Sequence, residues 1–131
     1  MATNNFKFDD VGLTTTTDMF VAELGEMKTP DDVFETYCKE LQFPFYFGFN
    51  WNALWDCLCS LDGIEQKNVC LVHKTMPALF RDAMILYLEI LHNAVDNWIL
   101  RPGDHLLNVY FPSCCENRIM HYLKDVKQYE M

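Results

Sequence analysis

The chain has 131 residues, of which half are hydrophobic and 22% are charged, so it can build one domain with its own core and is not a disordered chain. Its 19 acidic residues and 10 lysines and arginines give a formal net charge of -9, which excludes the basic surface of a free-standing nucleic-acid-binding protein. We therefore expect a basic partner. No apolar stretch approaches the roughly 18 residues of a membrane span. The first residues show no basic segment followed by an apolar run, so we expect a cytoplasmic protein.

The first half of the chain begins with a polar segment and continues with a strand and a helix. Residues 1–18, which contain a run of four threonines, are predicted to form an N-terminal extension before the ordered core. An apolar run over residues 19–24 is consistent with a buried strand, although its periodicity alone does not exclude a helix. Residues 30–41 are predicted to form a helix, because Thr29 can cap it and Pro30 suits its first position.

A second helix follows an aromatic segment and is predicted to begin after Asn50, which can cap it, and to carry a stripe of leucines toward the core. Residues 69–72 form a continuous apolar run, the pattern of a strand buried on both faces of a parallel sheet. A long helix over 77–100, a strand over 106–111 and a last helix over 116–127 complete the pattern. This alternation predicts an α/β fold in which a small, about three-stranded parallel sheet packs with helices.

Six cysteines and four histidines are present, but their spacing does not favour a metal or redox site. Cys57 and Cys59 lie two residues apart, and Cys114 and Cys115 are adjacent, so neither pair has the CxxC spacing of a zinc or dithiol site. Free thiols are expected, with no metal and no cofactor. A nucleophilic pair of Cys57 with a histidine is an open alternative, but Cys57 falls on the predicted core stripe, where we interpret it as a small buried apolar residue, so we predict that the chain is not an enzyme.

The most distinctive stretch is PFYFGFNWNALWDCL, over residues 44–58. It resembles the signature of the barstar family, small acidic bacterial proteins that inhibit secreted ribonucleases by occupying the active site. The expected order of strands and helices agrees with that family from about residue 19 to residue 111. The resemblance therefore implies a barstar-like domain over residues 19–112, with residues 1–18 as an N-terminal extension and residues 113–131 as a C-terminal helical extension packed on the same domain.

The second predicted helix would carry a polar face, because Asn52, Asp56, Cys59 and Ser60 fall at positions i, i+4, i+7 and i+8. Residues 31–64 hold six acids and one base, so negative charge gathers around this helix. The resemblance implies that Asp56, with aromatic neighbours, occupies the phosphate position of a basic ribonuclease cleft as a substrate mimic. The predicted partner-binding residues are Tyr46, Phe47, Gly48, Asn50, Trp51, Asn52, Trp55, Asp56, Cys59, Ser60 and Asn93.

The chain departs from the family pattern in its acids. Asn52 stands where the motif usually has an acid, and the acid that the family places before its last strand falls at Asn93, with Asp96 nearest to it. A changed acid set is what one expects of an immunity protein matched to a different toxin. We predict an inhibitor that is monomeric when free and binds a cognate basic toxin, a ribonuclease by the resemblance, without contacting nucleic acid or membrane.

Two alternatives stay open for this surface. Asp56 can be an ordinary solvated acid of a helix. The barstar-like scaffold can also serve a homotypic or regulatory interaction without a toxin, in which aromatic residues of the 43–55 segment form a dimer patch.

Overall fold

The computed structural model describes residues 6–9, 18–43, 48–101 and 103–126. Four parallel strands form one sheet in the order β1-β4-β3-β2, and they are β1 (Phe6–Phe8), β2 (Met19–Leu24), β3 (Asn68–His73) and β4 (Leu106–Phe111). The helices are α1 (Pro30–Glu40), α2 (Trp51–Ser60), α3 (Arg81–Leu100) and α4 (Glu116–Leu123), with a short 3-10 helix, η2, at Ser113–Cys115. The predicted α/β fold with a small parallel sheet is confirmed.

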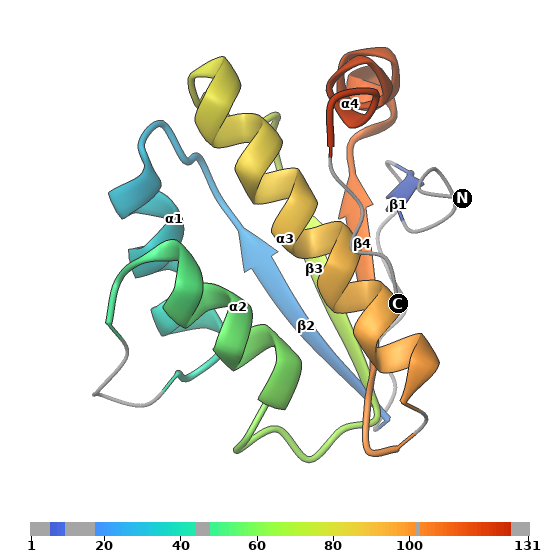
Figure 1. Cartoon of the computed structure of the whole chain (residues 1–131). Coiled ribbons are helices and arrows are strands. Elements are labelled where there is room, and N and C mark those ends of the chain that lie inside the picture. The colour runs from blue at the N-terminus through green and yellow to red at the C-terminus, as the bar shows by residue number, and fades with distance from the viewer. Residues whose placement is uncertain (1–5, 10–17, 44–47, 102, 127–131) are drawn as a thin grey trace.

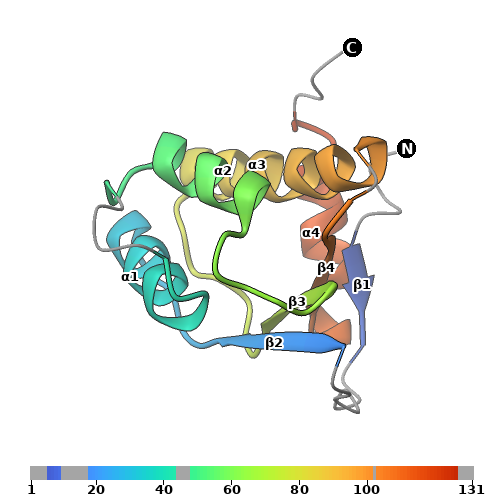
Figure 2. The ribbon, with the colours of Figure 1, turned by 90° about the horizontal axis from the view of Figure 1, so that it is seen from below.

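The helices α1, α2 and α3 lie over one face of the sheet, and α4 lies near the end of β4 (Figures 1 and 2). α2 and α3 run side by side over that face, and α1 lies next to β2. The central strand β3 is buried along most of its length, as its apolar run predicts, with Val69, Cys70 and Leu71 each at most 1% exposed. The sheet and the helices therefore enclose a single core between them.

The sheet has one strand more than the sequence pattern indicates. Phe6–Phe8 lies within the predicted N-terminal extension, yet it pairs in parallel with β4 and places Phe6 opposite Val109. Phe6 is buried, and its ring packs edge-on against Phe111 with 5.5 Å between the ring centroids. A strand of three residues is too short to show a period-2 pattern, so it carries no sequence signal of its own.

The start of α1 follows from capping, whereas two helix boundaries differ from prediction. The Thr29 side chain accepts a hydrogen bond from the Asp32 amide and the Asp32 carboxylate accepts one from the Thr29 amide, so α1 begins with a complete capping box. α4 ends at Leu123 rather than at residue 127. α3 begins at Arg81 rather than at residue 77. The Ala78 amide donates to the Met27 carbonyl over 2.8 Å, which holds the preceding segment in an extended path beside the entry to α1.

A buried chain of hydrogen bonds joins α1, α3 and the sheet. The Tyr37 and Tyr87 hydroxyls lie 2.6 Å apart, and Tyr87 lies 2.6 Å from His73 Nε2, while His73 Nδ1 lies 2.9 Å from the Tyr110 carbonyl. A carbonyl only accepts, so Nδ1 carries the proton and Nε2 accepts from Tyr87. Tyr87 in turn accepts from Tyr37. Burial lowers the pKa of His73 to about 4, which keeps the ring neutral near pH 7.

Across the described residues, every helix is too short or too polar to span a bilayer.

Candidate partner-binding site

The start of α2 is held by a tight turn over residues 48–50. Asn50 Oδ1 accepts a hydrogen bond from the Ala53 amide over 2.8 Å, and Asn50 Nδ2 donates to the Gly48 carbonyl over 3.1 Å. A side chain at residue 48 would crowd this arrangement, since a Cβ there would lie 2.9 Å from Asn50 Nδ2. Phe49, between them, has a φ of 51° and is 47% exposed. The turn therefore fixes the start of α2 and displays an aromatic ring beside it.

The far end of α2 is held by α3. Trp98 Nε1 donates to the Leu58 carbonyl over 2.8 Å, and Arg101 Nη2 donates to the Cys59 carbonyl over 3.1 Å. The Arg101 guanidinium also lies over the Trp98 ring, 5.4 Å from its centroid. These bonds satisfy carbonyl groups that a helix end otherwise leaves without partners. With both ends tied down, α2 presents its outer face as a rigid unit.

The outer face of α2 carries the polar residues that the sequence places there. Asn52, Asp56 and Ser60 are exposed, whereas Leu54 and Leu58 on the opposite side are fully buried. Cys59, which was expected on the same polar face, is half-buried. The predicted orientation of the helix is confirmed, and the binding role of these residues stays a prediction.

The two tryptophans of α2 contribute partly to the core. The Trp51 ring packs edge-on against Phe34, with 4.8 Å between centroids, and lies 6.3 Å from the Tyr87 ring. Trp55 is also half-buried and packs against the core. Each indole therefore offers only part of its surface to a partner.

Asn93, another predicted site residue, does not join this exposed face. Asn93 lies on α3, is 5% exposed, and donates from Nδ2 to the Glu89 carbonyl over 2.9 Å. Asp96 is half-exposed, with Oδ2 lying 3.5 Å from His92 Nε2. Burial lowers the pKa of His92, although Asp96 opposes that shift. Tyr46 and Phe47 lie outside the described residues.

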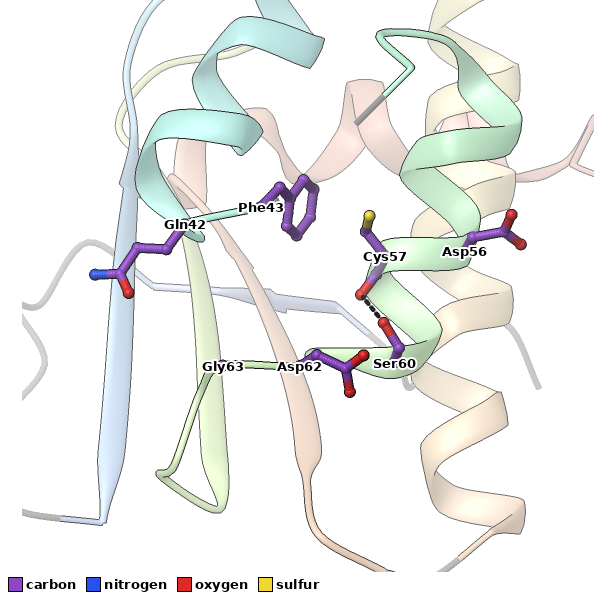
Figure 3. Close-up of a pocket in the computed structure, with 7 residues that line it drawn as sticks. All are labelled: Gln42, Phe43, Asp56, Cys57, Ser60, Asp62 and Gly63. Atoms are coloured by element: carbon purple, nitrogen blue, oxygen red, sulfur yellow. Dashed lines mark hydrogen bonds between the residues drawn. The ribbon is translucent and has the colours of Figure 1, made fainter. Parts of the chain in front are cut away.

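A pocket of about 450 Å³ opens beside α2 (Figure 3). The sequence did not predict it, because its lining comes from the segment after α1, from α2 and from the turn after α2. Cys57 was expected in the core, yet it is half-buried and lines this pocket. The pocket is lined by Gln42, Phe43, Asp56, Cys57, Ser60, Asp62 and Gly63.

The thiols of α2 are poor nucleophiles. Burial raises the pKa of Cys57, and the carboxylates of Asp56 and Asp62 raise it further. Burial also raises the pKa of Cys59 to about 11, although Arg101 acts in the opposite direction. Within the described part of the chain, no three His, Cys, Asp or Glu side chains are grouped so that they could hold a metal ion. The described part of the site presents the half-exposed ring of Phe49 and the exposed carboxylates of Asp56 and Asp62.

Comparison with known protein families matches residues 17–111 to the family described as Barstar (barnase inhibitor). The match spans more than half of the chain and includes α2, the turn before it and the pocket beside it. It leaves out β1 and α4. No curated protein matches the chain.

Proposed function

Because the chain belongs to the barstar family, we propose that it is an inhibitor or immunity protein that binds a cognate basic toxin, a ribonuclease, and blocks its active site. The family description names an inhibitor of barnase, and this supports a binding protein rather than an enzyme. The nature of the enzyme that this chain blocks and the residues that block it are part of this proposal.

The observation that carries the proposal is the exposed carboxylate of Asp56 on a helix that is fixed at both ends. A ribonuclease binds the RNA phosphate with cationic side chains. A carboxylate held in place by a rigid helix can accept hydrogen bonds from those side chains where the phosphate would sit. Because α2 is already ordered, binding costs little of the entropy that ordering a loop would cost.

The charge of the chain supports the same partner. A net charge of -9, with six of its acids between residues 31 and 64, steers a basic protein toward the face that carries α2. We expect the association rate constant to fall as salt is added, because exposed charges more than about 8 Å apart are screened at 0.15 M ionic strength.

Asn52 changes the proposed contact one helical turn before Asp56. Its exposed amide can still donate and accept hydrogen bonds, but it lacks the charge that makes a hydrogen bond to a cation about twice as strong. We therefore propose that the cognate toxin lacks, or places elsewhere, the cation that an acid at this position would meet. In this way the protein would discriminate between related toxins.

The proposal is tested by affinity capture from a lysate of the source organism at low salt, with the wild type and Asp56→Ala as parallel baits. The captured material is released with urea, refolded and assayed for RNA cleavage. We expect ribonuclease activity from the wild-type bait only, and unchanged thermal stability of the variant, because Asp56 is exposed. Equal ribonuclease capture by both baits would remove Asp56 from the mechanism.

Capture of no ribonuclease by either bait would contradict the toxin proposal itself. In that case, an average mass that rises with protein concentration in light scattering, and no longer rises in Trp55→Ala, would favour the homotypic alternative.

A further inference from the structure

The pocket beside α2 has walls that are held by backbone hydrogen bonds, and one of these walls is apolar. The Phe43 amide donates to the Cys38 carbonyl over 3.1 Å, and the Leu61 amide donates to the Cys57 carbonyl over 2.8 Å. Leu61 and Gly63 then have φ values of 48° and 89°, so the chain turns sharply after α2. The walls of the pocket are therefore set by the end of α1 and by a tight turn.

Aromatic and acidic groups lie on different sides of this pocket. Figure 3 shows the Phe43 ring facing α2, with the Cys57 thiol beside it, and the Asp62 carboxylate near Ser60 at the end of the helix. The Asp56 carboxylate points away from Phe43. The pocket thus has an apolar wall, with the Asp62 carboxylate at the end of the helix, and Asp56 lines it on the side away from Phe43.

The electrostatic surroundings favour a cation. Among the described residues that line the pocket none is basic, and a second hollow shares Ser60, Asp62 and Gly63 and adds the acids Glu65 and Asp104 together with the imidazole of His105. The volume of about 450 Å³ exceeds the lower limit of about 300 Å³ for small-molecule sites, so one long side chain fits inside.

We propose that this pocket receives an arginine side chain of the toxin and that Asp62 is the carboxylate that recognises it. The arginine stem would lie along Phe43 and Cys57, its planar guanidinium would stack on the Phe43 ring, and its forked N–H groups would donate to Asp62. Lysine is less well suited, because its ammonium group is more strongly hydrated and cannot stack on the ring as a plane.

This inference rests on the proposed function and adds a second point of contact to it. Asp56 would enter the toxin's cleft, and an arginine of the toxin would enter the pocket beside α2. Two insertions in opposite directions fix the orientation of the two proteins. Asp62 also adds a carboxylate to this surface, which has the neutral Asn52 where the family pattern has an acid.

The pocket is tested first without any toxin, by titrating N-acetyl-arginine amide into the full chain and following backbone amide shifts by NMR. We expect saturable shifts at residues 43, 57, 62 and 63. Asp62→Asn should weaken binding about fivefold, which corresponds to one exposed ion pair of about 1 kcal/mol. Glu23→Gln removes the same charge from an exposed position on β2 and should leave binding unchanged.

Equal binding by wild type and Asp62→Asn, or equal weakening by Glu23→Gln, would overturn the inference. A second arm uses the captured ribonuclease and separates the two proposals. Full affinity of Asp62→Asn, together with loss of affinity in Asp56→Ala, would overturn the pocket's role and leave the inhibitor function standing. An arginine site in the isolated chain with no ribonuclease captured would contradict the inhibitor function alone.

Discussion

Replacing Tyr87 by phenylalanine removes the middle of the buried chain of hydrogen bonds and nothing else from the core. Tyr87 donates to His73 Nε2 and accepts from the Tyr37 hydroxyl, each over 2.6 Å, and all three side chains are almost completely buried. The ring of a phenylalanine fills the same space. The variant therefore isolates the effect of one hydroxyl on two buried polar partners.

The cost follows from which groups lose their partners. Tyr87→Phe leaves both the His73 ring nitrogen and the Tyr37 hydroxyl buried without a hydrogen bond, at about 1.5 kcal/mol each, so the free energy of unfolding should fall by about 3 kcal/mol. Tyr37→Phe leaves no donor behind, because Tyr87 still donates to His73, and should cost about 1 kcal/mol. The double variant leaves only His73 unsatisfied and should cost about 1.5 kcal/mol, less than the sum of the single variants.

The assay is urea unfolding of all four proteins at pH 7, monitored by tryptophan fluorescence. The slope of unfolding free energy against urea concentration is then compared among the four proteins. Unchanged slopes would show that the variants unfold from equally compact native states. Equal losses of unfolding free energy for the two single variants, or losses that simply add in the double variant, would refute the donor-to-acceptor order of the hydrogen bonds from Tyr37 through Tyr87 to His73.

Three further predictions follow from groups already described. The free energy of unfolding should fall by about 2 kcal/mol from pH 7 to pH 5 on account of His73. The unfolded chain takes up a proton at His73 over this range, and the native ring, with a pKa of about 4, does not. A His73 imidazole NMR signal that titrates near pH 6.5 in the folded protein would contradict this. Asn50→Ala should cost about 1 kcal/mol in urea unfolding by removing the cap of α2, and Asn52→Ala, on the exposed face, should cost almost nothing; equal costs would exclude the cap. At pH 8, Cys59, with a pKa of about 11, should be alkylated by iodoacetamide far more slowly than exposed Cys114, and comparable rates by mass spectrometry would show that Cys59 is not shielded.

Most of the strands and helices can be predicted from apolar runs or stripes that are long enough to show a pattern. The runs at residues 19–24, 69–72 and 106–111 predict β2, β3 and β4, and the stripes after Thr29 and Asn50 predict α1 and α2. β1 is stabilised by pairing with β4 and by packing on Phe111, and neither contact is visible in three residues of sequence. The start of α3 was misplaced for the same reason, since a hydrogen bond to Met27 determines the path before it.

The part of the candidate site that lies on a single helix can be predicted from the sequence. The exposed face of α2 follows from helical spacing alone, because Asn52 and Asp56 are one turn apart. The pocket is not predictable in this way, because Phe43 and Asp62 come from opposite sides of α2 in the sequence and meet only in the folded chain. Asn93 was placed by resemblance to the family, and its burial depends on how α3 packs.

The most direct test of the inhibitor function is a steady-state titration of the captured and refolded ribonuclease with this chain at several RNA substrate concentrations. Blocking the active site predicts complete inhibition at one inhibitor per enzyme and an apparent inhibition constant that rises linearly with substrate concentration, with kcat unchanged at saturating RNA. An inhibition constant that does not depend on substrate concentration, or cleavage that continues at full rate in the complex, would contradict the account.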